Sequence, residues 1–184
     1  LNSWITTTTN KDIKPSNILE LGLGESSKTI SNYIKHINPH ANHLIIEHDI
    51  EWKNTFLAKH ELSKKTMIEI CPLTKKENEA NSNLVYSDFK NKTEGYFDFI
   101  LIDGPFGSKS DSRSEILIKV NEFSNEKDFV ILFDDTHRDG DIQTLLKIEK
   151  KLNELNVNYL KSSYQGVKEC SIICSTKLKF LTSL

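Results

Sequence analysis

The feature that most constrains how this chain folds is a short apolar run that ends at two closely spaced glycines. Residues 18–21 read Ile-Leu-Glu-Leu, and Gly22 and Gly24 follow in the spacing Gly-x-Gly. After a polar turn, apolar residues recur at helical spacing, at Ile30, Tyr33, Ile34 and Ile37. This order predicts a strand, a tight turn and a helix. Glycine lets the backbone approach a ligand, and a helix start offers unpaired N–H groups, so the turn is typical of a site for a nucleoside-bearing ligand.

The rest of the chain alternates between apolar runs and helical patterns. Further strands are expected at residues 43–49, 66–73, 97–102, 129–133, 157–160 and 169–175. Helices are expected at residues 50–60 (with Trp52, Phe56 and Leu57 facing inward), 110–123 and 142–155, whereas residues 74–92 indicate a loop or a short helix. The last two strands, joined by residues 162–166, predict an antiparallel hairpin. The expected fold is a single doubly wound α/β domain with a mostly parallel, seven-stranded sheet and an antiparallel C-terminal hairpin.

Length, composition and charge fit one ordinary globular domain. The chain has 184 residues, of which 37% are hydrophobic and 27% charged, and a net charge of −2. This charge gives no electrostatic footprint for nucleic acid or an anionic membrane, and no apolar run reaches the length of a membrane span. Cys71, Cys170 and Cys174 lie in or beside apolar runs without the spacing of a metal site. We expect buried, reduced thiols, which fits a cytoplasmic location.

The first residues differ in character from the rest. Residues 1–16 are polar and rich in Thr, with Trp4 and Ile5 as the bulky side chains. We expect an N-terminal arm here, which either packs on the domain through Trp4 or lies as a flap over a ligand. The domain itself is expected at residues 17–184. The chain begins with Leu rather than Met, so its start is either a native end or a cut from a longer protein.

Acidic residues follow two of the expected strands at the points where ligands bind in open α/β sheets. Glu47 ends the second apolar run, and an acid there can accept hydrogen bonds from ribose hydroxyls. Asp49 is the rival for this role, or a cap for the next helix, and His48 is expected to be a loop residue. Asp103 ends the strand at residues 97–102, so we expect it to face the reacting groups, with capping of the Gly104-Pro105 turn as its alternative role.

The densest group of ionisable residues follows the fifth strand. Residues 134–139 read Asp-Asp-Thr-His-Arg-Asp. His137 is a candidate general base that needs no metal. Asp134 or Asp135 could instead cap the helix that follows, with Arg138 neutralising the group or pairing with an acidic substrate.

The residues Glu20, Gly22 and Gly24 resemble motif I of the class I S-adenosylmethionine (SAM)-dependent methyltransferases, which reads acid-x-Gly-x-Gly. The resemblance covers residues 18–174. It implies that this loop wraps the methionine part of SAM, that Glu20 orients the amino-acid end and that Glu47 holds the ribose. A dinucleotide-binding fold would want a third glycine where Ser27 stands, which disfavours an NAD(P)-binding oxidoreductase domain. A catalytically silent methyltransferase-like subunit, which binds a ligand or serves assembly, is the third hypothesis.

Two further likenesses narrow the family. Residues 101–105, Leu-Ile-Asp-Gly-Pro, resemble the Val-Asp-Gly-Pro signature of the plant glucuronoxylan methyltransferases. Asp103, Asp134 and Asp135 fall on the Mg²⁺ ligands of the catechol-type O-methyltransferases, with Asp135 in place of an Asn. The resemblance implies SAM-dependent transfer to a hydroxyl or carboxyl oxygen of a saccharide or another hydroxyl compound. It also implies Asp103 as a catalytic group, with Mg²⁺ or another divalent cation held by the three acids, whereas His137 is the catalytic alternative to the metal. The acceptor, the need for a metal and the oligomeric state stay open.

Overall fold

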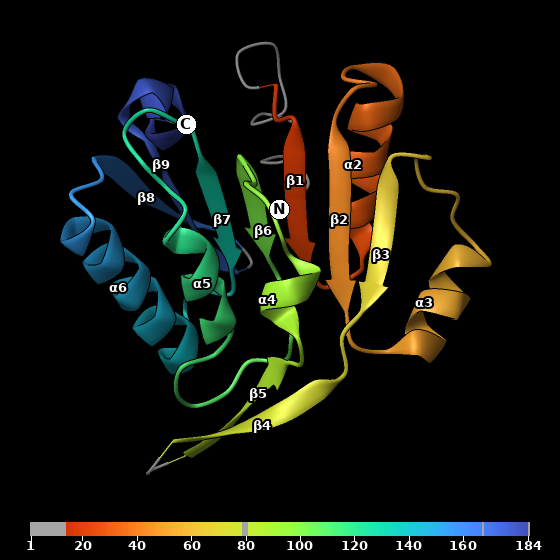
Figure 1. The fold of residues 1–184 in the computed structure, drawn as a ribbon, viewed down its shortest axis with the longest axis horizontal. Helices are drawn as coiled ribbons and strands as arrows, with labels where there is room; N and C mark the ends of the chain where they lie inside the picture. The colour runs from red at the N-terminus through yellow and green to blue at the C-terminus, as the bar shows by residue number, and fades with distance from the viewer. Residues whose placement is uncertain (1–13, 79–80, 167, 184) are drawn as a thin grey trace.

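The computed structural model describes residues 14–78, 81–166 and 168–183. Within them, a seven-stranded sheet has the strand order β3-β2-β1-β6-β7-β9-β8, in which β9 is antiparallel to both of its neighbours (Figure 1). The predicted fold class is therefore confirmed. The strands of this sheet are β1 (Asn17–Leu21), β2 (Asn42–Glu47), β3 (Thr66–Ile70), β6 (Phe99–Ile102), β7 (Val130–Asp134), β8 (Tyr159–Gln165) and β9 (Glu169–Ser175).

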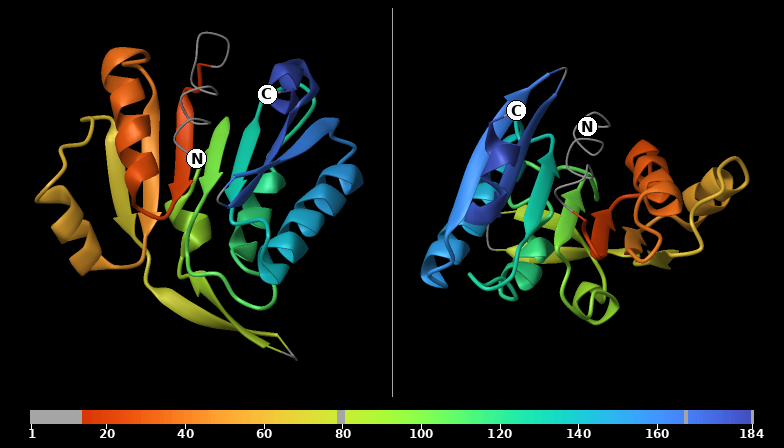
Figure 2. Two further views of the ribbon diagram at one scale, coloured as in Figure 1. Left: turned by 180° about the vertical axis from the view of Figure 1, so that it is seen from behind. Right: turned by 90° about the horizontal axis from the view of Figure 1, so that it is seen from above.

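Helices cover both faces of the sheet (Figure 2). One face packs against α2 (Glu25–His36), α3 (Ile50–Leu57) and the 3₁₀ helix η2 (Thr176–Thr182). The other face packs against α4 (Phe89–Lys92), α5 (Leu117–Val120) and α6 (Asp139–Glu154), with the 3₁₀ helix η1 (Ser114–Ile116) directly before α5. Because the central strands β6 and β7 are buried on both faces, their sequences are almost continuously apolar, as the pattern predicted.

The prediction for residues 74–92 was wrong for most of its length. Two antiparallel strands, β4 (Leu73–Asn78) and β5 (Asn81–Tyr86), form a separate hairpin here, and α4 follows it. Figure 1 shows this hairpin beyond the carboxyl ends of the parallel strands, where it runs from the end of β3 beneath β1 and β6. The sequence of this hairpin is mostly polar and lacks the apolar alternation that would have identified two strands.

Three smaller predictions also need correction. The helix expected at residues 110–123 shrinks to η1 and α5, because Asp111 and Arg113 have positive φ angles that a helix excludes. Of the side chains expected to face inward on α3, only Phe56 is buried, whereas Trp52 and Leu57 are exposed. Residues 162–165 belong to β8 rather than to a connecting loop.

Three further predictions concern the cysteines, membrane spans and the N-terminal arm. Cys71, Cys170 and Cys174 are buried and unpaired, as expected. None of the helices in the described ranges is both long and apolar enough to cross a membrane. The proposed N-terminal arm, including Trp4, lies outside the described residues except for residues 14–16.

Candidate active site

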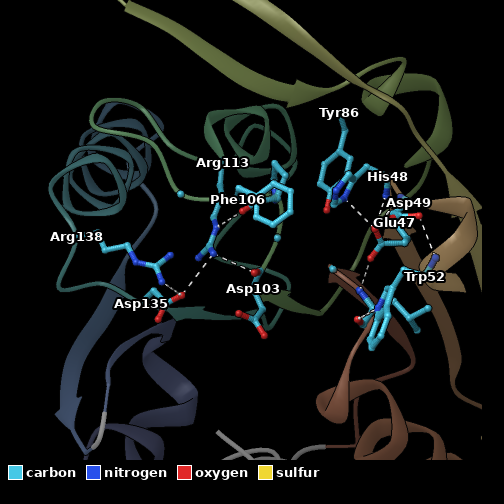
Figure 3. Close-up of a pocket in the computed structure, with 15 residues that line it drawn as sticks. Glu47, His48, Asp49, Trp52, Tyr86, Asp103, Phe106, Arg113, Asp135 and Arg138 are labelled. Carbon is cyan, nitrogen blue, oxygen red and sulfur yellow. Dashed lines mark hydrogen bonds and ion pairs between the residues drawn. The ribbon is translucent and has the colours of Figure 1, made fainter. Parts of the chain in front are cut away.

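A pocket with a volume of about 460 Å³ opens at the carboxyl ends of β1, β2 and β6 (Figure 3). This volume lies in the range of small-molecule sites, and the place is where ligands bind in open α/β sheets. Backbone from the glycine turn, acids from the strand ends and several aromatic rings line it. The lining residues are Gly22, Leu23, Glu47, His48, Asp49, Trp52, Tyr86, Asp103, Gly104, Pro105, Phe106, Gly107, Arg113, Asp135 and Arg138.

The floor of the pocket is formed where the turn after β1 meets the turn after β6. Gly22 has a φ of +96°, which favours glycine, and an added Cβ there would lie 3.1 Å from the backbone nitrogen of Gly104. A Cβ on Gly104 would lie 2.6 Å from Tyr86 Oη and 2.9 Å from Gly22 Cα. The two backbones therefore touch without room for a side chain. Gly24, by contrast, has open space around it and does not line the pocket.

This difference yields a matched pair of substitutions. Gly104→Ala should lower the free energy of unfolding by about 1–3 kcal/mol, because the new methyl group meets backbone that cannot move freely. Gly24→Ala should change it by less than about 1 kcal/mol, because its φ of −168° suits any residue and nothing lies within 4 Å of its Cβ. Urea denaturation followed by circular dichroism measures both. Equal losses in the two variants would contradict the close contact of the two turns.

Glu47 and Asp49 have distinct roles at the end of β2. Asp49 caps α3, because its carboxylate accepts hydrogen bonds from the backbone N–H groups of Glu51 and Trp52. Glu47 Oε1 accepts the backbone N–H groups of His48 and Asp49 at 2.7 and 2.9 Å, and Glu47 Oε2 accepts that of Leu23 at 2.9 Å. With one donor, Oε2 keeps capacity for a second, such as a ligand hydroxyl. Glu47 thus ties the glycine turn to β2 and also lines the pocket.

Glu20 does not reach the pocket. It alternates with Leu19 and Leu21 along β1, so its side chain lies on the sheet face that α2 covers. There it is fully buried, accepts a hydrogen bond from Ser26 Oγ and pairs with His43 Nε2 at 2.9 Å. These contacts join the first turn of α2 to β1 and β2. A role of Glu20 toward SAM stays a prediction, and from this position it would act by holding the turn.

Four rings surround the middle of the pocket, and the sequence pattern had identified none of them as ligand contacts. Trp52 lies on the rim, where its Nε1 donates to the carbonyl of Leu23 at 2.8 Å. Phe106 is 69% exposed and lies edge-on to His48, with ring centroids 5.1 Å apart. Tyr86 comes from the end of β5, and its buried Oη has no hydrogen-bond partner among the described residues. The hairpin that the sequence missed therefore delivers a side chain to the site.

Asp103 meets the two aspartates that follow β7. The ligand oxygens of Asp103, Asp134 and Asp135 lie within 4.8 Å of one another, so the structure brings together the three residues predicted as metal ligands. Burial and the charge of Asp134 raise the pKa of Asp103 from 3.8 to about 6. We call these three residues the carboxylate cluster. An acid with a pKa near neutrality at the edge of a pocket is suited to accept a proton.

Three cationic side chains lie against the carboxylate cluster. Lys168 Nζ is 3.0 Å from Asp135 Oδ1 and 3.9 Å from Asp134 Oδ2. The other carboxylate oxygen of Asp135 has an Arg138 nitrogen at 3.0 Å and an Arg113 nitrogen at 3.6 Å. Burial acts to raise the pKa of Asp135, but these cations outweigh it and lower the pKa below 3.8. The hydrogen bond to Asp135 raises the pKa of Lys168 in turn.

Arg113 is a site residue that the sequence did not reveal. It is 2% exposed, and its guanidinium donates to the carbonyl groups of Asp103, Pro105 and Asp134 at 2.9–3.0 Å. One nitrogen also lies 3.7 Å from buried Asp141. Arg113 therefore clamps the loop after β6 to the end of β7. No local pattern marks it, because the carbonyl groups that it binds lie 8 to 21 residues away in the sequence.

The remaining predictions for the segment after β7 fare differently. His137 is exposed and does not line the pocket, so the structure does not bring this candidate base to the site. Neither Asp134 nor Asp135 caps α6, whose N-cap residue is Arg138 without a side-chain capping bond. Arg138 does line the pocket beside Asp135 (Figure 3).

Solved structures of methyltransferases share this fold. The O-methyltransferase TomG from Streptomyces achromogenes, in complex with SAM, superposes with a TM-score of 0.58 at 12% identity, over 95% of this chain and 78% of that one. An O-methyltransferase from Bacillus cereus, in complex with S-adenosylhomocysteine (SAH), gives 0.57 at 12% identity, over 95% and 80%. SAH-bound PaMTH1 from Podospora anserina gives 0.56 at 17% identity, over 93% and 75%. No family model matches the sequence, and no curated protein matches it. The comparisons therefore establish the Rossmann-like methyltransferase fold.

Proposed function

We propose that this protein is a SAM-dependent O-methyltransferase. The observation that carries the proposal is a pocket that holds two acids suited to different tasks, one to binding a hydroxyl group and one to accepting a proton. Glu47 at one side is tied to the glycine turn and has an oxygen left for a hydroxyl, and Asp103 at the other side has a raised pKa. Solved proteins of the same fold are described as O-methyltransferases in complex with SAM or SAH.

The residues of the pocket fit a nucleoside-bearing ligand. The turn at Gly22 exposes backbone to the pocket, Glu47 would accept a ribose hydroxyl, and the rings of Trp52 and Phe106 would stack with a base. The buried Tyr86 Oη, which has no hydrogen-bond partner among the described residues, would donate to such a ligand. When bound, SAM would supply an activated methyl group on its sulfonium.

Asp103 would hold and deprotonate the acceptor. A carboxylate whose pKa lies near 6 is ionised at neutral pH and is still a better base than an unperturbed aspartate. Arg113 fixes its position through the main-chain carbonyl at 2.9 Å. Since SAM carries its own leaving group, the chain mainly needs to orient the acceptor oxygen and remove its proton.

The acceptor in this proposal is a hydroxyl or carboxyl oxygen of a saccharide or another hydroxyl compound. Support comes from the lining of the pocket, where Phe106 is 69% exposed and the Arg138 side chain is 40% exposed. A sugar ring packs well against an exposed aromatic side chain, and Arg138 would bind a uronic acid carboxylate.

Calorimetric titration tests the cofactor first. We expect SAH to bind with micromolar affinity and NAD⁺ to show no binding, because the pocket lacks the third glycine of dinucleotide sites. Glu47→Ala should weaken SAH binding about tenfold or more, because it removes both the ligand contact and the tie to Leu23. Transfer of labelled methyl from SAM to a panel of sugars and phenols then identifies the acceptor. Binding of NAD⁺ alone would favour the oxidoreductase hypothesis, and binding of neither ligand would favour a silent subunit.

A further inference from the structure

The carboxylate cluster has the ligand atoms of a metal site, but positively charged side chains of this chain lie beside it. Carboxylate oxygens are the ligands that hard divalent ions prefer, and those of Asp103, Asp134 and Asp135 lie close enough to share one ion. The type of ligand therefore fits a metal such as Mg²⁺. The positive charges beside these ligands do not fit a metal ion, as the contacts of Asp135 show.

Asp135 is the acid whose contacts decide the matter. Both of its oxygens have cationic neighbours, with Lys168 at 3.0 Å from Oδ1, and Arg138 and Arg113 at 3.0 and 3.6 Å from Oδ2. Among the described residues, the three carboxylates of the cluster thus lie near three positive side chains, one of which, Arg113, also faces the buried carboxylate of Asp141. A divalent ion bound by Asp135 would lie near the cations that contact this carboxylate, and this repulsion opposes its binding.

The position of Lys168 follows from the topology of the sheet. Because β9 runs antiparallel to β7, Asp134 at the carboxyl end of β7 pairs with Cys170 near the start of β9. The backbone N–H of Thr136 also donates to the carbonyl of Glu169 at 3.0 Å. These bonds hold the residue before β9 against the loop after β7. Lys168 therefore reaches the carboxylate cluster from the start of β9.

We propose that the ammonium group of Lys168 neutralises the carboxylate cluster in place of a divalent cation, and that the site works without a bound metal. The binding part of this proposal is independent of the activity of the protein. The catalytic part rests on the proposed function. There, the positive charge of Lys168 would reduce the repulsion between Asp103 and Asp135, and also their repulsion of an anionic acceptor. This departs from the metal site that the resemblance to catechol-type enzymes implies.

Mn²⁺ binding by wild type and Lys168→Met tests the proposal directly. Lys168 is 53% exposed and Asp135 keeps its two arginines, so the variant should fold, which circular dichroism checks. In calorimetry and in Mn²⁺-induced water-proton relaxation, we expect no wild-type binding at millimolar Mn²⁺. Lys168→Met should gain affinity by about tenfold or more. Adding Asp135→Asn to this variant should abolish the gain.

Lys177→Met is the matched control. Lys177 is 61% exposed and pairs with Asp128 at 3.6 Å, next to the amino end of β7 and away from the cluster, so its loss should leave Mn²⁺ binding unchanged. Micromolar Mn²⁺ binding by the wild type would overturn the proposal, and so would equal, negligible binding by wild type and Lys168→Met. The relaxation measurement on the wild type tests the proposal even if the Lys168→Met variant fails to fold.

Catalysis gives a separate readout. Methyl transfer by the EDTA-treated wild type should be undiminished and should not respond to added Mg²⁺, whereas an enzyme that EDTA silences and Mg²⁺ restores would contradict metal independence. Failure of the protein to bind SAH would instead count against the proposed function and would leave the Mn²⁺ result intact.

Discussion

Asp103→Asn is expected to lower the rate of methyl transfer by about 10²–10⁴-fold, the range that a positioned general base contributes. The amide keeps the size of the carboxylate but cannot take a proton from the acceptor. SAH affinity should stay within a few-fold of wild type, because Gly22, Glu47 and the rings of the pocket remain in place. Transfer of labelled methyl and calorimetry with SAH measure the two quantities.

The pH profile of the wild type is a second readout of the same role. Burial and the charge of Asp134 raise the pKa of Asp103 to about 6, and the base must be ionised to act. The rate should therefore fall as the pH drops through about 6 and level off above it. Asp128→Asn, at a half-exposed acid next to the amino end of β7, is the control and should retain full activity. Wild-type rates in Asp103→Asn would remove Asp103 from the mechanism.

Arg113→Met is expected to lower the free energy of unfolding by about 3–5 kcal/mol, the usual cost of breaking a buried ion pair by removing one partner. The substitution leaves three backbone carbonyls without their donor. It also leaves the buried carboxylate of Asp141 without the positive charge of Arg113. Asp141 is fully buried, and burial already raises its pKa, so it tolerates the loss of a cation poorly. Urea denaturation followed by circular dichroism measures the change.

Two variants distinguish the loss of the buried Arg113 contacts from the loss of one positive charge. Arg138→Met removes a cation at 3.0 Å from Asp135, which Arg113 also faces at 3.6 Å, but the Arg138 side chain is 40% exposed, so the cost should stay below about 1 kcal/mol. Arg113→Met combined with Asp141→Asn should recover part of the stability, because the stranded carboxylate is gone. Equal costs for Arg113→Met and Arg138→Met would show that the carbonyl contacts of Arg113 contribute little.

The elements whose residues contact one another locally could be predicted from the sequence. The turn from β1 to α2 was identified from its own glycines, and the helix appeared where the apolar spacing placed it. The strands β6 and β7 are buried on both faces, so their apolar runs were unambiguous. The acids at the ends of β2, β6 and β7 follow from these strands, since the carboxyl ends of parallel strands meet at one edge of the sheet. This is why Glu47, Asp103 and Asp135 line one pocket.

Contacts between distant segments settled the rest. The direction of Glu20 depends on which sheet face α2 covers, and period-two alternation beside Leu19 and Leu21 places it away from the pocket. Arg113 and Lys168 reach the site from a loop and from the antiparallel return of β9, and neither arrangement leaves a mark in the neighbouring residues. A buried strand can be recognised from its own apolar side chains, whereas the partner of a buried charge is set by packing between segments far apart in the chain. The sequence therefore determined the fold and the edge of the sheet that holds the site, and the packing decided which charges meet there.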